Sequence, residues 1–197
     1  MRLALCVFAR APRAGRVKTR LIATLGADGA AALYARLLTR MLAVAAEAPV
    51  ATREIHVDMA ESLPWFSALP DFRCRVQVEG DLGRRMHVAC TTLLDSHDAV
   101  LLTGSDLLDV TATDLALAAN WLRSDAEVVL GPVADGGYWL IGLRRPQPAL
   151  FDDMPWSTRG VYAATVARLA ARGNAWRALP LRHDVDDESD LMLVAGG

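Results

Sequence analysis

Basic side chains are concentrated in a short loop-like segment near the start of the chain. They are Arg10, Arg13, Arg16, Lys18 and Arg20, and the segment also contains Pro12 and Gly15. A guanidinium group binds two phosphate oxygens at once, and a lysine adds a compact positive charge. The glycine spacing of a Walker loop or of a G-x-G-x-x-G fingerprint is absent. We therefore predict a different kind of phosphate-binding loop, with a solvated charged loop as the alternative.

Carboxylates follow a second apolar run, in Gly104-Ser105-Asp106, and recur in the acidic tail as Asp184 and Asp186. A carboxylate at the end of a parallel strand faces the same crevice as the basic loop, where a hard cation such as Mg²⁺ can link it to phosphate oxygens. Residues two apart in an extended segment point the same way. We predict a Mg²⁺ or Mn²⁺ site with Asp106 as its first ligand, which Asp184 and Asp186 can complete. The alternatives are a turn-capping role for Asp106 and a solvated acidic tail.

Glycines accompany polar side chains in two further segments. In Asp135-Gly136-Gly137-Tyr138, the glycines would let a ligand approach the backbone, Asp135 could accept a hydrogen bond from a substrate hydroxyl, and Tyr138 could stack on a ring. A hairpin turn with core aromatics is the alternative. The segment around Gly83 opens a helix and offers N–H groups to an anion or a base edge, or is a plain connection.

Segments of strand and helix pattern alternate along the chain and would position these residues. Strands are expected at 3–9, 54–58, 74–78, 99–103, 127–130 and 138–143, and helices at 27–48, 62–69, 82–94, from Thr111 or Thr113 to about Leu122, at 160–172 and at 187–194. This alternation favours an α/β fold with a mostly parallel sheet and crossover helices. The carboxyl ends of its strands would carry the site.

Composition sets further limits. The 197 residues are 53% hydrophobic and 22% charged, as expected of one globular domain spanning 1–197. A net charge of −2 gives no drive toward nucleic acid or an anionic membrane surface. No run approaches the roughly 20 apolar residues of a membrane span. The three cysteines, Cys6, Cys74 and Cys90, have neither disulfide nor zinc-site spacing. We expect a cytoplasmic protein.

With these segments in place, the chain resembles a family of small bacterial proteins assigned as glycosyltransferases with a glycosyltransferase-A-like (nucleotide-diphospho-sugar transferase-like) fold, also described as radical-SAM/selenodomain-associated transferases. Six ordered motifs over nearly the whole length carry the resemblance: Arg10 to Leu21, Gly80 to Met86, Gly104 to Leu108, Gly131 to Gly142, Pro155 to Thr158 and Asp184 to Leu191. Compared with the family pattern, Arg10 replaces a lysine, Leu108 a turn proline and Asp187 a threonine.

The resemblance implies a three-layer α/β/α sandwich. It also implies roles for four groups of residues: Arg13, Gly15, Lys18 and Arg20 at the nucleotide phosphates, Gly83 near the base, Asp106 at the metal, and Asp135 to Gly137 near the acceptor. The expected partners are a nucleotide or nucleotide-sugar donor and a small-molecule acceptor, which Tyr138 would also contact.

Three functions remain open. The first is a metal-dependent glycosyltransferase that uses a nucleotide-diphospho-sugar, with Asp106 and Asp135 as catalytic residues. The second is a nucleotidyltransferase similar to guanylyltransferases, which would release pyrophosphate. The third, motivated by Leu108 in place of the turn proline, is a catalytically silent nucleotide-binding protein.

Overall fold

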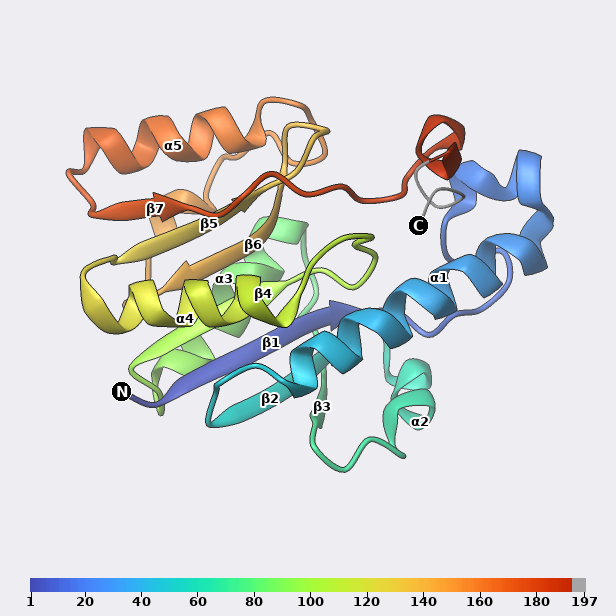
Figure 1. Ribbon diagram of the computed structural model, residues 1–197, viewed down its shortest axis with the longest axis horizontal. Helices are drawn as coiled ribbons and strands as arrows, with labels where there is room; N and C mark the ends of the chain where they lie inside the picture. The colour runs from blue at the N-terminus through green and yellow to red at the C-terminus, as the bar shows by residue number, and fades with distance from the viewer. Residues whose placement is uncertain (193–197) are drawn as a thin grey trace.

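Seven strands form one sheet in the computed structural model, which describes residues 1–192 (Figure 1). The strands are β1 (Leu3–Ala9), β2 (Thr52–Val57), β3 (Arg73–Val76), β4 (Ala99–Thr103), β5 (Val128–Pro132), β6 (Tyr138–Leu143) and β7 (Trp176–Ala178). Their order is β3-β2-β1-β4-β6-β5-β7. β6 runs antiparallel to β4 and β5, whereas the other pairs are parallel. The carboxyl ends of β1, β2, β3 and β4 therefore lie at one edge of the sheet.

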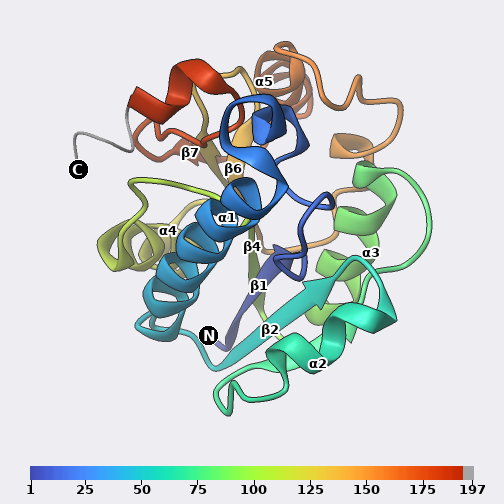
Figure 2. The same ribbon diagram turned by 90° about the vertical axis from the view of Figure 1, so that its right-hand side faces the viewer.

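Helices cover both faces of the sheet. They are α1 (Ile22–Ala46), α2 (Leu63–Phe66), α3 (Leu82–Leu94), α4 (Ala112–Ser124) and α5 (Val161–Ala171). α1 and α4 pack on one face, through a core that includes Met41, Leu101 and Leu115, and α3 and α5 pack on the other, through Met86, Val100 and Leu169 (Figure 2). The result is the predicted α/β/α sandwich. β1 and β4 lie between two helical layers, which explains why their sequences are almost entirely apolar.

Most predicted elements are confirmed. β1, β4, β6 and α3 match the predicted bounds, and α4 begins with a capping box in which Thr111 and Asp114 bond to each other's backbone N–H. β7 was not predicted, because its three residues, with one half-buried tryptophan, are too few to show an alternation of apolar and polar side chains. The tail forms only the 3₁₀ turn Glu188–Asp190 and the start of a helix; Leu193 and Val194 of the predicted 187–194 helix lie outside the described residues.

The first helix bears on the expectation that no segment of the chain spans a membrane. By length and composition alone, Thr19–Ala46 could cross a membrane. Its backbone is kinked at Gly26, whose φ is 71°. The buried side chains of Tyr34, Leu38 and Met41 pack against the sheet, including β2. A core helix has the same composition, and the face that it buries here is the one expected of a crossover helix. A location in the cytoplasm stays a prediction.

Candidate active site

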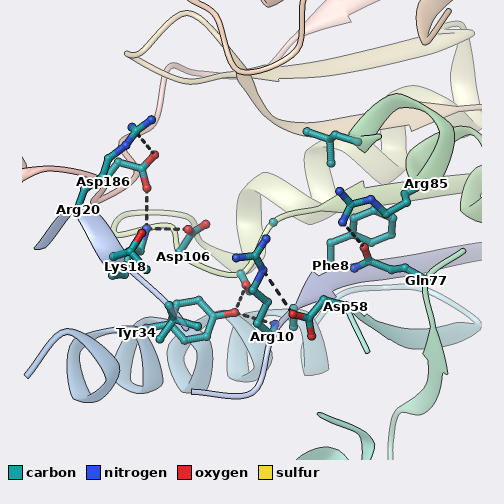
Figure 3. Close-up of a pocket in the computed structure, with 16 residues that line it drawn as sticks. Phe8, Arg10, Lys18, Arg20, Tyr34, Asp58, Gln77, Arg85, Asp106 and Asp186 are labelled. Carbon is teal, nitrogen blue, oxygen red and sulfur yellow. Dashed lines mark hydrogen bonds and ion pairs between the residues drawn. The ribbon is translucent and has the colours of Figure 1, made fainter. Parts of the chain in front are cut away.

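A cavity of about 470 Å³ lies at the carboxyl ends of the parallel strands (Figure 3). Segments far apart in the sequence line it. Its lining includes the side chains of Phe8, Arg10, Lys18, Arg20, Tyr34, Asp58, Gln77, Leu82, Arg85, Ser105, Asp106 and Asp186. The predicted basic loop after β1, the predicted carboxylate after β4 and the acidic tail are therefore brought together. The tail reaches this edge by running from β7 across the sheet ends toward the start of α1 (Figure 1).

Lys18 lies at the centre of the charged end of the cavity (Figure 3). Its Nζ donates to Asp106 Oδ2 at 2.7 Å and to Asp186 Oδ1 at 2.8 Å. The Lys18 side chain is only 4% exposed, whereas those of Asp106 and Asp186 are 35% and 42% exposed. Burial alone would lower the pKa of Lys18, but the charges and hydrogen bonds of the two carboxylates outweigh it and raise this pKa. Lys18 is therefore a protonated, almost buried cation.

The backbone at Lys18 is unusual as well. Its φ of 45° and ψ of 45° lie in the left-handed region, which residues other than glycine adopt at a cost in conformational free energy. The residue immediately precedes the 3₁₀ turn Thr19–Leu21, whose Leu21 is buried beside α1 and Val185 of the tail. The buried anchor and the two carboxylates thus hold Lys18 in a strained backbone conformation.

Tyr34 on α1 joins two of the loops that form the cavity. Its hydroxyl accepts from the backbone N–H of Arg10 at 2.9 Å and lies 2.8 Å from Ser105 Oγ. The side chain is buried, so neither partner can be replaced easily by water. Tyr34 therefore fixes the basic loop after β1 relative to the Asp106 loop after β4. Its place in an Ala- and Leu-rich helix gave no sequence signal beyond a core aromatic.

The opposite end of the cavity combines apolar and polar side chains. Phe8 and Leu82 supply apolar surface. Gln77 is fixed at both ends of its amide, because Nε2 donates to the carbonyl of His56 at 2.8 Å and Oε1 accepts from Arg85 at 3.3 Å. Apolar surface beside oriented donors and acceptors suits a planar heterocycle. Gln77 and Arg85 were missed as site residues, since only their position after β3 and on α3 brings them here.

Asp58 adds a carboxylate between the two ends, and it was missed too. It lies 3.7 Å from Arg10 Nε and accepts from Ser62 Oγ at 3.0 Å. This contact holds Arg10 over the cavity. The side chain of Arg10 stays 56% exposed, so it remains available to an anion.

A second cavity, of about 300 Å³, adjoins the first. The residues that line both are Arg20, Leu82, Gly104, Asp106 and Asp186, and the second adds Asp135, Gly137, Tyr138, Trp156 and Asp184. Asp135 Oδ1 accepts from the backbone N–H of Gly137 at 2.8 Å, which fixes the carboxylate at the cavity wall. The predicted acceptor residues Asp135, Gly137 and Tyr138 thus meet the predicted metal residues at a shared boundary between two cavities.

The acidic residues at this boundary, Asp106, Asp135, Asp184 and Asp186, outnumber the two cations beside them, Lys18 and Arg20, of which Arg20 lies 3.8 Å from Asp186. Burial raises the pKa of Asp184 to about 7, with further contributions from the charges of Asp186, Asp135 and Asp106. Carboxylate oxygens are ligands that Mg²⁺ and Mn²⁺ prefer, so the type of donor and the excess charge both fit a hard divalent cation. Within residues 1–192, however, no three acidic, histidine or cysteine side chains are arranged to hold a metal ion. The predicted trio Asp106, Asp184 and Asp186 is not preassembled, because Lys18 lies between two of its members.

Four predicted residues do not line these cavities. Arg13 donates to the backbone carbonyl of Glu61, and Gly15 lies in an exposed turn with φ of 75°. A Cβ on Gly83 would overlap Trp156 and the carbonyl of Phe151, and one on Gly136 would overlap the backbone of Arg159. Close packing is therefore one reason for glycine at positions 83 and 136. The predicted contacts with a base and an acceptor stay predictions.

Comparisons with known proteins agree with this architecture. The family model described as "Uncharacterized protein conserved in bacteria (DUF2064)" matches residues 25–158. The crystal structure of a "putative nucleotide-diphospho-sugar transferase" from Desulfovibrio desulfuricans G20 is 33% identical, with a TM-score of 0.91 over 98% of this chain and 87% of that one. No curated protein matches the sequence.

More distant structures share the fold. CMP:2-keto-3-deoxy-manno-octonic acid synthetase in complex with CTP is 12% identical, with a TM-score of 0.63 over 100% of this chain and 98% of that one. Glucosyl-3-phosphoglycerate synthase from Mycobacterium tuberculosis, in complex with Mn²⁺, UDP and glucosyl-3-phosphoglycerate, is 11% identical, with a TM-score of 0.59 over 97% of this chain and 74% of that one. The glycosyltransferase-A-like fold is thereby confirmed. On the family match and the 33% identity, the chain belongs to the DUF2064 family of bacterial proteins.

Proposed function

We propose that this protein is a metal-dependent transferase that uses a nucleotide-diphospho-sugar as its donor. The observation that carries the proposal is that Asp106 and Asp186, which line both cavities, are paired with Lys18, which lines the larger one. A diphosphate at the boundary between the two cavities would have cationic groups beside it and carboxylates for a metal behind it. The related protein from Desulfovibrio desulfuricans, whose description names the same class, supports the proposal.

The donor fits the larger cavity in one direction. Its base would lie between Phe8 and Leu82, with Gln77 and Arg85 available for its polar edge. Its diphosphate would then reach Lys18, with Arg10 and Arg20 also lining the same cavity. The bound sugar would face the second cavity. Base and phosphate would thus be held by different segments of the chain.

The acceptor would enter through the second cavity. Asp135 is exposed and oriented by Gly137, so it can accept a proton from an acceptor hydroxyl that attacks the sugar. Asp106 and Asp186 would hold the cation, which would neutralise charge on the departing nucleoside diphosphate. Lys18 and Arg20 would add further positive charge at the leaving group. Each proposed role belongs to a side chain that lines one of the two cavities.

Identifying the released product tests the proposal. The purified protein would be incubated with Mn²⁺, a panel of hydroxylated or phosphorylated acceptors and, in separate reactions, a panel of nucleotide sugars or a panel of nucleoside triphosphates, and the released nucleotide or pyrophosphate would be analysed by chromatography. Release of a nucleoside diphosphate, lost in Asp106→Asn, supports glycosyl transfer. Release of pyrophosphate from a nucleoside triphosphate would identify a nucleotidyltransferase. Nucleotide binding with no turnover of either donor class would identify a silent binding protein.

A further inference from the structure

Lys18 occupies the position between Asp106 and Asp186 that a divalent cation would need. One Nζ lies within 2.8 Å of an oxygen from each carboxylate. A Mg²⁺ ion held by the same two oxygens would bind each at about 2.0–2.1 Å, and so would fill the same space. The ammonium group and the metal therefore compete for one place.

Lys18 cannot simply leave this place in the free protein. Its side chain is 4% exposed, and a buried ammonium without an anionic partner is strongly unfavourable. Two of its three N–H donors are already used by the carboxylates. The same side chain lines the cavity beside Arg10 and Arg20, where an anionic ligand would be attracted. A phosphate group there would offer Lys18 a replacement partner.

We propose that Lys18 is a built-in counter-ion that keeps the divalent cation away from Asp106 and Asp186 until a nucleotide diphosphate draws its ammonium group away. This inference rests on the proposed function. Lys18 is thus a positioning residue as well as a phosphate ligand, and metal and nucleotide bind cooperatively. By linkage, each raises the affinity for the other by the same factor. The free protein holds little metal, and the carboxylates stay paired until a donor is present.

A metal-binding measurement in the absence of nucleotide tests whether the Lys18 ammonium group and the metal ion exchange places between Asp106 and Asp186. Free Mn²⁺ would be followed by electron paramagnetic resonance in titrations of the wild type, Lys18→Met and Arg16→Met. Methionine keeps the length of Lys18 and the same left-handed backbone cost, but removes the competing charge. Arg16 is an exposed cation of the same loop that lines neither cavity, so its variant controls for the loss of one positive charge.

The exchange predicts that Lys18→Met binds Mn²⁺ about ten-fold more tightly than the wild type, equivalent to about 1.4 kcal/mol, while Arg16→Met stays within about two-fold. Circular dichroism verifies folding. If Lys18→Met does not fold, Lys18→Gln, which can still donate to the carboxylates, takes its place with the same expected direction. In either folded variant, Mn²⁺ affinity equal to or weaker than that of the wild type overturns the inference.

A parallel measurement separates this failure from that of the proposed function. Thermal unfolding of the wild type would be recorded with ADP, CDP, GDP and UDP, each with and without Mn²⁺. If one nucleotide stabilises the wild type in a Mn²⁺-dependent way but Lys18→Met gains no Mn²⁺ affinity, the inference fails and the proposed function stands. If none of the four stabilises the wild type, the proposed function fails, and the inference fails with it.

Discussion

Replacing Tyr34 by phenylalanine should weaken both the fold and the site. The change deletes one hydroxyl and leaves the ring, which packs with Leu38 and Ile55, in place. Two hydrogen bonds are lost, to the backbone N–H of Arg10 and to Ser105 Oγ. Ser105 is buried and the Arg10 N–H is part-buried, so water does not easily replace the lost hydroxyl at Ser105.

The size of the effect follows from these two bonds. Each typical hydrogen bond contributes a net amount of about 0.5–1.5 kcal/mol, and a buried group left without a partner costs about 1–3 kcal/mol. We therefore expect Tyr34→Phe to lower the free energy of unfolding by about 2 kcal/mol. For a domain of this size, that corresponds to a fall in Tm of roughly 4–8 °C. Nucleotide affinity should fall as well, because Arg10 and the Asp106 loop lose their common anchor.

Urea denaturation at pH 7 and nucleotide titration measure the two effects. Tyr162→Phe is the matched control, since the Tyr162 hydroxyl forms no hydrogen bond with any of the residues that the structure describes. It should change the free energy of unfolding by less than about 0.5 kcal/mol. If Tyr34→Phe were as stable as Tyr162→Phe and bound nucleotide like the wild type, the role assigned to this hydroxyl would be refuted.

Three further predictions concern charge and packing. The pKa of Asp184 is raised to about 7 in the folded protein, so its charged form opposes folding as the pH rises above the pKa of the unfolded chain. Asp184→Asn should therefore raise the free energy of unfolding of the metal-free protein, measured in urea at pH 8. This gain in stability should vanish below about pH 4. Burial would raise the pKa of Asp114, but hydrogen bonds from Arg182 and Thr111 outweigh it and lower this pKa. The stability that Asp114 contributes should therefore be present above its unfolded pKa and lost as the pH falls through its folded pKa. Asp114→Asn should reduce the dependence of the free energy of unfolding on pH in urea denaturation between pH 2 and pH 7, about the range set by carboxylate pKa values. Gly83→Ala should lower the free energy of unfolding by about 1–3 kcal/mol, because its Cβ overpacks against Trp156, and thermal unfolding measures this loss. A loss of nucleotide affinity without a loss of stability would contradict the packing role.

The sequence allowed the sheet, most helices and the two charged partners of the site to be predicted, for a physical reason. Strands such as β1 and β4 are buried on both faces, so their apolar runs stand out, and the basic and acidic segments directly follow them. Strand ends of a parallel sheet share one edge, which brings Lys18 and Asp106 together. The pairing of Lys18 with Asp186 could not be predicted, because it depends on the path of the tail after the missed β7.

Residues that support the site through tertiary contacts left no local pattern. Tyr34 reads as one more core position of an apolar helix, and its role depends on the hydroxyl reaching two loops. Gln77 and Arg85 meet only because β3 and α3 end and begin at the same edge. Gly83 lies in a recognised motif, and its close packing with Trp156 could not be predicted from that motif. Sequence spacing therefore predicts where charged segments lie, whereas the side chains that contact them depend on the tertiary structure.

Isothermal titration with the best-binding nucleotide sugar shows whether Asp106 binds a metal ion beside the donor diphosphate that Lys18 contacts. The measurement compares the wild type with Asp106→Asn, each with and without Mn²⁺. Mn²⁺ should strengthen binding to the wild type at least about ten-fold, whereas Asp106→Asn should bind with the same weak affinity in both conditions. If Asp106→Asn retained the full metal-dependent gain, the metal would lie elsewhere and the proposed role of Asp106 would be wrong.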